Sequence, residues 1–119
     1  MAFVGTYERK VLRGGWVRFP KDWLTLLGDN RKVFIMPDPD GGKSLFIVAA
    51  DEFRKELKRM AAVESSDDGS KAIADSAVLV EIAADGRILI PAKFLTHAGI
   101  KGVVCFLGNM RTVSLSPKC

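Results

Sequence analysis

The sequence predicts a mainly β fold with short helices, assembled from two copies of one small unit. The first observation is segment 85–99, in which a turn, a short strand, a proline and a glycine-terminated helix follow one another. The second is segment 15–28, which repeats this order without a gap. The third is a composition of 48% apolar and 27% charged residues, which is typical of a globular chain.

The order of residue types explains each element of the later segment. Gly86 accepts a positive φ without steric cost and therefore predicts a turn. Isoleucines alternate with other residues along 87–90, so this strand is expected to bury one face. Pro91 suits the first position of a helix, and Gly99 suits the position just past its end. The turn therefore places Arg87, the first residue of this strand, at the open end of a rigid strand pair.

The earlier segment carries equivalent residues at a constant offset of 71 residues, from Gly15 to Gly86 and from Gly28 to Gly99. Between these glycines the equivalent pairs are Pro20 and Pro91, Leu24 and Leu95, Thr25 and Thr96, Val17 and Ile88, Phe19 and Ile90, and Trp23 and Phe94. A shared order of residue types over this length is unlikely to arise by chance. We interpret it as an internal duplication of one β-rich unit.

Further strands are predicted on either side of these segments. In the first copy they are 6–12, 16–19, and a hairpin of 33–36 with 44–48 across the turn-forming residues 37–42. In the second copy they are 78–83, 88–90, and a hairpin of 103–107 with 111–115 across a turn at Gly108-Asn109. The resulting domain division is a first repeat with a connecting helix at 1–62 and a linker with the second repeat at 63–119, together forming one compact domain.

One longer helix is expected between the repeats. Phe53, Leu57 and Met60 recur at helical spacing, with charged residues on the other faces. The simplest interpretation is a helix that packs on the sheet, and docking of a partner subunit is the alternative. A polar linker at 64–70 and a short helix at 71–76 are expected to follow.

Positive charge is concentrated in the first repeat. The net charge is +4, and residues 1–62 hold twelve Lys and Arg against eight Asp and Glu, whereas residues 63–119 hold six of each. A basic patch favours a polyanionic partner, of which nucleic acid is the commonest, although a modest excess also serves solubility alone. The basic residues of this run are Arg9, Lys10, Arg13, Arg18, Lys21, Arg31 and Lys32.

With both copies aligned, the chain resembles the MraZ family of bacterial regulators, within the AbrB-like superfamily. The resemblance covers nearly the whole chain. It is carried by Phe3-x-Gly5-x-Tyr7-Glu8, by Val80-Glu81-Ile82-x-x-x-Gly86-Arg87-Ile88-Leu89-Ile90-Pro91-Ala92-Lys93-Phe94, and by Gly108-Asn109 with Val113-Ser114-Leu115. The resemblance implies a duplicated swapped-hairpin β-barrel. It also implies ring assembly and binding to repeated short DNA boxes, with transcriptional regulation at the cell-division and cell-wall gene cluster.

The family carries Asp-x-x-x-Arg once per repeat on turns that face DNA, and this chain departs from that motif. In the second copy the arginine is Arg87, but Ala83 occupies the aspartate position. In the first copy the two positions hold Leu12 and Trp16. An exposed Trp16 would stack on a base or bind a protein, and the alternative is a tryptophan folded over the sheet edge.

Neighbouring residues offer replacements for the missing members of the motif. We hypothesise that Asp85 supplies the missing carboxylate and that Arg13 supplies the missing arginine. An arginine on a tight turn can contact guanine with two hydrogen bonds or pair with phosphate. The predicted DNA-binding residues are Arg87, Arg13, Arg9, Lys10, Arg18 and Lys93.

Enzymatic chemistry is not expected. His97 has no neighbouring ligand at metal-binding spacing, so no metal site is predicted. The Asp residues form no carboxylate pair that can be placed in a cleft, and the Ser residues lack a His and Asp arrangement. No catalytic residue, no cofactor and no small-molecule substrate are predicted. No apolar run approaches the ~20 residues of a membrane span, and the N-terminus has no signal-peptide pattern. Cys105 is expected to be a reduced core residue, and Cys119 a disordered terminal one.

The sequence thus predicts a cytoplasmic, nucleoid-associated regulator that binds double-stranded DNA weakly per protomer and associates with itself, in a ring if the family pattern holds. The alternative is a degenerate MraZ paralogue that acts as a protein-interaction module with little DNA binding. The losses at Leu12, Trp16 and Ala83 favour the alternative, and the basic run favours DNA.

Overall fold

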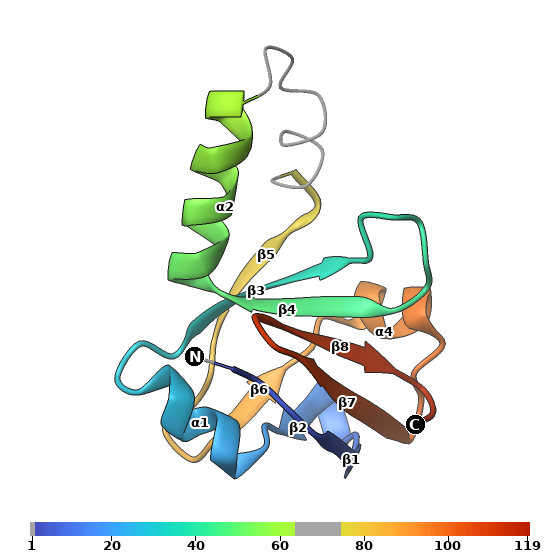
Figure 1. Cartoon of the computed structure of the whole chain (residues 1–119). Helices are drawn as coiled ribbons and strands as arrows, with labels where there is room; N and C mark the ends of the chain where they lie inside the picture. Colours follow the sequence, from blue (N-terminus) through green and yellow to red (C-terminus); the bar gives the residue numbers. More distant parts are fainter. Residues whose placement is uncertain (1, 64–74) are drawn as a thin grey trace.

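The order strand, strand, helix, strand, strand occurs twice along the chain (Figure 1). The computed structural model describes residues 2–63 and 75–119, and of residues 60–63 the backbone alone. The first half contains β1 (Thr6–Lys10), β2 (Trp16–Arg18), α1 (Lys21–Leu27), β3 (Lys32–Pro37) and β4 (Leu45–Ala49). After α2 (Ala50–Val63), the second half contains β5 (Val78–Glu81), β6 (Arg87–Leu89), α4 (Ala92–Ala98), β7 (Val103–Asn109) and β8 (Thr112–Ser116).

Strands from both halves share one antiparallel sheet. Its order is β1-β7-β8-β4-β3-β5, and β2 pairs with β6 in a separate two-stranded ribbon. The prediction of a mainly β fold with short helices is therefore confirmed. Each predicted strand and the short helix of each repeat are present, with boundaries that differ by a few residues.

The described strands do not close into the barrel implied by the family resemblance, so that part of the prediction is wrong. Each ribbon strand is tied back to the preceding segment by a turn hydrogen bond, from Leu12 N to Trp16 O (2.7 Å) and from Ala83 N to Arg87 O (2.8 Å). Glycines with positive φ lie within both of these turns, and they redirect the chain out of the sheet. As a result β2 and β6 pair only with each other, and β1 and β5 remain the edges of the larger sheet.

The outer strands of the sheet pair across the two halves. β1 of the first half pairs with β7 of the second, and β5 of the second half pairs with β3 of the first. The two registers are equivalent, because the pair Tyr7–Phe106 becomes Val78–Ile35 when each position is moved by the 71-residue offset, and both pairs are observed. The ribbon shows the same relation, since Val17 lies directly opposite Ile88.

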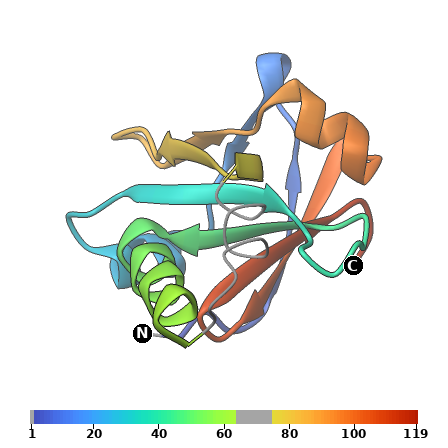
Figure 2. The same cartoon turned by 90° about the horizontal axis from the view of Figure 1, so that it is seen from above.

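One face of the six-stranded sheet forms the main core. The ribbon, α1 and α4 lie on this side of the sheet (Figures 1 and 2). The strands contribute fully buried apolar side chains, which pack in one cluster with those of the ribbon, α1 and α4. The equivalent helical aromatics Trp23 and Phe94 are 1% and 4% exposed. Trp23 is surrounded edge-on by the rings of Phe3, Tyr7 and Phe19. Burial at alternate positions of these strands explains why the alternation of apolar residues in the sequence predicted them.

Helix α2 covers part of the opposite face and projects away from the sheet (Figure 1). Phe53 stacks on Phe34 of β3 with ring centroids 4.3 Å apart, and Leu57 packs against the same cluster. The prediction that this helix packs on the sheet is confirmed. The predicted linker at 64–70 lies outside the described residues, as do positions 71–74 of the predicted short helix.

The last hairpin turns later than predicted, at Met110, which has φ 69°. Gly108 and Asn109 belong to β7 instead. Gly108 N donates to Gly5 O (2.9 Å), and a Cβ at Gly108 would lie 2.5 Å from Phe3 O. This glycine is therefore required by the close approach of the N-terminal segment and not by a turn.

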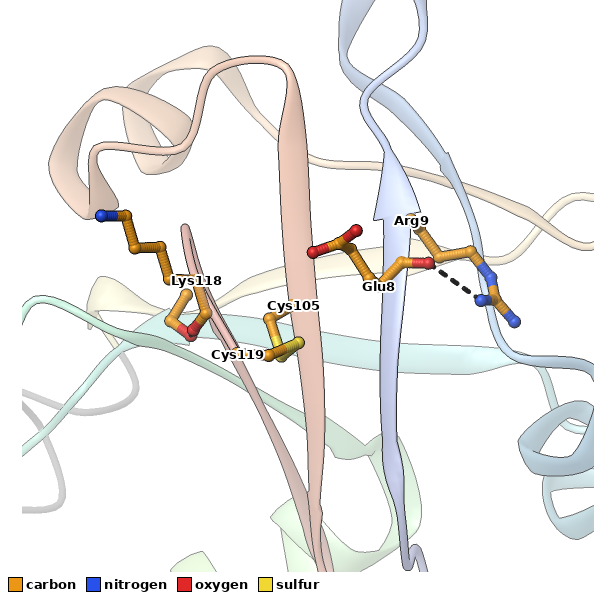
Figure 3. The surroundings of a disulfide bond; sticks show 6 residues. Glu8, Arg9, Cys105, Lys118 and Cys119 are labelled. Atoms are coloured by element: carbon orange, nitrogen blue, oxygen red, sulfur yellow. Dashed lines mark hydrogen bonds between the residues drawn. A yellow bond between two sulfur atoms is a disulfide. The ribbon is translucent and has the colours of Figure 1, made fainter.

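The two cysteines form a disulfide, so the predictions of a reduced Cys105 and a disordered Cys119 are wrong (Figure 3). Cys105 lies opposite Ser116 in the β7–β8 hairpin. Ser116 Oγ donates to Lys118 O (2.9 Å), and this local turn returns Cys119 to a Cα–Cα distance of 5.2 Å from Cys105. The pairing depends on strand register, which residue types alone do not reveal.

Candidate nucleic-acid interface

The ribbon of β2 and β6 has one buried face and one outward face. Val17 and Ile88 point into the core and are 0% exposed. Side chains alternate along a strand, so the remaining positions share the opposite face. We define the ribbon face as Trp16, Arg18, Arg87 and Leu89.

Arg87 is held in one orientation on the ribbon face. Its Nε donates to Asp85 Oδ2 (2.6 Å), and its backbone N donates to Asp85 Oδ1 (3.3 Å). Its guanidinium lies 5.3 Å from the centroid of the Trp16 ring, within cation–π range. Asp85 thus makes the ion pair expected of a replacement for the carboxylate missing at Ala83. Both side chains remain partly exposed, at 38% for Arg87 and 49% for Asp85.

The charge state of Asp85 depends on Arg87. Partial desolvation raises the pKa of Asp85, but the hydrogen bonds from Arg87 and the charges of Arg87 and Arg18 outweigh it and lower the pKa below its ordinary value. A carboxyl group with a lowered folded-state pKa contributes stability that is present above its unfolded pKa and is lost as pH falls through the folded pKa. The ion pair therefore persists throughout the neutral range.

A carboxyl-carbon NMR titration is expected to place the Asp85 midpoint below the ordinary value of 3.8. In Arg87→Ala the midpoint should move up toward that value, because the donor hydrogen bonds and the cation are gone. An Asp85 midpoint that does not respond to Arg87→Ala would contradict the ion pair.

The other predicted arginine of the turns, Arg13, lies at the opposite end of the ribbon from the Arg87 turn. It occupies a 3₁₀ turn (Arg13–Gly15) directly before β2 and is exposed. Since β2 and β6 run antiparallel, the two turns flank the ribbon face at its two ends. Trp16 is half-buried beneath the Arg87 guanidinium, so it is neither fully exposed nor fully covered.

Beside the ribbon lies a cleft of about 470 Å³ lined by basic side chains. We name it the basic cleft and define it by Arg9, Arg18, Lys21, Arg31 and Asp85. The cations come from β1, β2, the start of α1 and the segment before β3. Lys21 and Arg31 belong to the basic run of the sequence but were not predicted as site residues. That run is the only feature of the sequence that points to them.

Two predicted residues are not brought to this region. Lys10 follows Arg9 on β1 and therefore points to the opposite face of the sheet. Lys93 lies on α4, where its Nζ is 5.1 Å from the centroid of the Phe94 ring. Neither contributes to the ribbon face or to the lining of the basic cleft.

Residues 2–63 and 75–119 contain no group of three or more His, Cys, Asp or Glu side chains that could hold a metal ion. Within the same ranges, no helix has the length and apolar character that a membrane crossing requires. Comparison with protein-family models finds no match, and a search of curated proteins finds no significant relative.

Proposed function

We propose that this chain is a DNA-binding transcriptional regulator that resembles the MraZ family and contacts double-stranded DNA through its ribbon face. The observation that carries the proposal is a two-stranded antiparallel ribbon with Arg18 and Arg87 directly opposite each other on its outward face. The major groove of B-DNA admits a two-stranded β-ribbon, and an arginine there can make two hydrogen bonds to guanine. Cations in the adjoining basic cleft add attraction to phosphate.

The pairing pattern supports descent from a duplicated swapped hairpin. Equivalent strands pair across the halves in equivalent registers, and the equivalent residues Val17 and Ile88 meet at the centre of the ribbon. Such an arrangement is expected when two copies of a dimer-forming hairpin are joined in one chain. In this proposal the ribbon is the pseudo-symmetric centre of the molecule, and its two turns face DNA together.

Self-association on repeated DNA sites belongs to the same proposal. The sheet face away from the core carries exposed Leu79 and Leu107, at 47% and 43% exposure, and the half-buried Phe46. A second copy is the proposed cover for these apolar side chains. Linking several weak contacts on one DNA molecule raises the overall affinity by about 10²–10⁴, which would compensate for a weak contact per protomer.

Removing Arg87 is the most direct test. In a fluorescence-anisotropy titration against upstream DNA of its own gene cluster, Arg87→Ala and Arg18→Ala should each weaken binding by about 1–3 kcal/mol. Arg13→Ala should act mainly through phosphate and reduce the salt dependence by about one unit of slope. Arg54→Ala is the matched control, since it removes the same charge from the outer side of α2, where Arg54 faces Asp51 at 3.8 Å.

Equal losses in Arg54→Ala and Arg87→Ala would indicate a general charge effect and contradict a role for the ribbon face. No saturable binding of the unaltered protein at low salt would instead favour the second candidate, a protein-interaction module. That candidate is supported by the apolar members of the ribbon face, Trp16 and Leu89, and by the exposed Leu12 beside them. Light scattering with and without DNA measures the oligomeric state in the same samples.

A further inference from the structure

Four cations line the basic cleft, and among the described residues none of them forms an ion pair with a carboxylate. The ion pairs found among the described residues are Arg54–Asp51, Arg59–Glu56 and Arg87–Asp85. Asp85, which also lines the cleft, is therefore already engaged by Arg87. Like charges gathered in a concave site repel one another and focus a positive potential, so such a site is stabilised when an anion enters.

The cleft cations come from separate elements and are positioned independently of one another. Arg9 is fixed by a hydrogen bond from its guanidinium to Glu8 O (3.0 Å) and by the Tyr7 ring, 5.2 Å from its centre. Arg31 is anchored through its backbone, because Ile82 N donates to Arg31 O (2.8 Å). Arginine forks and a lysine ammonium are the groups that proteins use to hold phosphate oxygens. The floor of the cleft includes the apolar side chains of Phe19 and Leu24.

A second hollow adjoins the basic cleft and has a different lining. It measures about 560 Å³ and shares Arg31 and Ala84 with the cleft. Its other polar side chains are Asp29 and Glu81, which accept hydrogen bonds. Carboxylates of this kind bind the hydroxyls of a ribose. The two hollows together offer cations for phosphates on one side and acceptors for a sugar on the other, at volumes typical of small-molecule sites.

We propose that the basic cleft binds a free small molecule that carries two or more adjoining phosphates, of the nucleoside polyphosphate class, with its nucleoside in the adjoining hollow. A concave site lined by four cations suits the phosphates of one compact ligand. The ribbon face, in contrast, is the surface that an extended duplex can reach. This site goes beyond the proposed DNA contact and departs from the prediction, made from the sequence, of no cofactor and no small-molecule substrate.

A regulatory consequence rests on the proposed function. Arg18 belongs to both the ribbon face and the basic cleft. A polyphosphate that neutralises Arg18 would weaken the attraction of the ribbon face for DNA, so ligand and DNA would compete. The direct binding of the ligand does not depend on this consequence and is measured without DNA.

Isothermal titration calorimetry at constant ionic strength tests the site, with ATP and inorganic tripolyphosphate as the two probes. The unaltered protein should bind one molecule of either probe per chain, and ATP more tightly. Lys21→Gln and Arg31→Gln should each weaken binding about tenfold or more, since each removes a charge-assisted contact. Lys43→Gln and Arg54→Gln, which remove equal charge from the exposed β3–β4 turn and from α2, should change the affinity less than about twofold. Thermal unfolding of every variant verifies the fold.

Absence of saturable heat up to about 1 mM of either probe would overturn the proposal. Equal weakening in the control variants would overturn it too, because binding would then follow net charge alone. If tripolyphosphate binds as tightly as ATP, the nucleoside part is overturned. Arg13→Ala separates the two functions, since Arg13 lies outside the lining of the basic cleft and its loss should weaken DNA binding and retain the affinity for ATP. If the unaltered protein binds DNA but does not bind ATP, this inference is refuted and the proposed function stands.

Discussion

Trp23→Ala is expected to lower the free energy of unfolding by about 3–5 kcal/mol. Trp23 is 1% exposed and lies where the N-terminal segment, β1, β2 and α1 meet. Its ring contacts four aromatic residues, including Phe106 of the central sheet at 6.1 Å between centroids. Its Nε1 also donates to Val4 O (3.1 Å), and this bond ties the N-terminal segment to α1. Alanine removes the packing and the hydrogen bond together and leaves a large cavity.

Chemical denaturation followed by circular dichroism measures this loss. Trp16→Ala is the matched control, because it removes the other tryptophan from a partly exposed site, and its cost should be about 1 kcal/mol or less. Trp23→Phe should fall between the two, since it keeps a ring but loses the hydrogen bond to Val4. Similar losses in Trp16→Ala and Trp23→Ala would contradict the central position of Trp23 in the core.

Cys119→Ser is expected to lower the free energy of unfolding by about 3 kcal/mol. The disulfide closes a loop with a sequence separation of 14 between Cys105 and Cys119. Such a loop restricts the unfolded chain, and the restriction disappears when one sulfur is removed. Cys119 is the position to change because it is exposed, whereas Cys105 is 2% exposed and serine there would bury a polar group. Denaturation with and without a thiol reductant provides the measurement.

The reductant supplies the control for this prediction. It should destabilise the unaltered protein by the same amount as the substitution, and it should leave Cys119→Ser unchanged. If the unaltered protein is equally stable with and without reductant, the disulfide does not contribute to folding as expected. Mass spectrometry of the unaltered protein with a thiol-blocking reagent establishes how many cysteines are free before denaturation.

Local residue chemistry was sufficient to predict the elements that form the ribbon and the short helices. Gly15 and Gly86 have φ of 94° and 88°, conformations that favour glycine, and Pro20 and Pro91 directly precede α1 and α4. These residues act on their own neighbours in sequence, so the pattern alone reveals them. The alternation of apolar residues in the strands likewise follows from burial of one face.

Features that depend on distant contacts were not predictable in the same way. The disulfide requires the register of β8 on β7, and the position of the last turn depends on Phe3 approaching Gly108. The basic cleft gathers Arg9, Lys21 and Arg31 from parts of the chain whose spacing in sequence has no regular period. Only the Asp85–Arg87 pair, separated by two residues, is short-range enough to have been proposed from the sequence.

The cross-half strand pairing has a consequence for how the chain reaches its native state. β1 forms its strand hydrogen bonds only when it pairs with β7, which brings Thr6 opposite Leu107. β5 follows α2 in the chain and must return to pair with β3. Each step closes a long loop, whose entropic cost precedes the gain from the contacts it allows. Topologies of this kind fold in milliseconds to seconds, far more slowly than helical bundles. A nascent chain on the ribosome therefore cannot complete its sheet until the final hairpin has emerged.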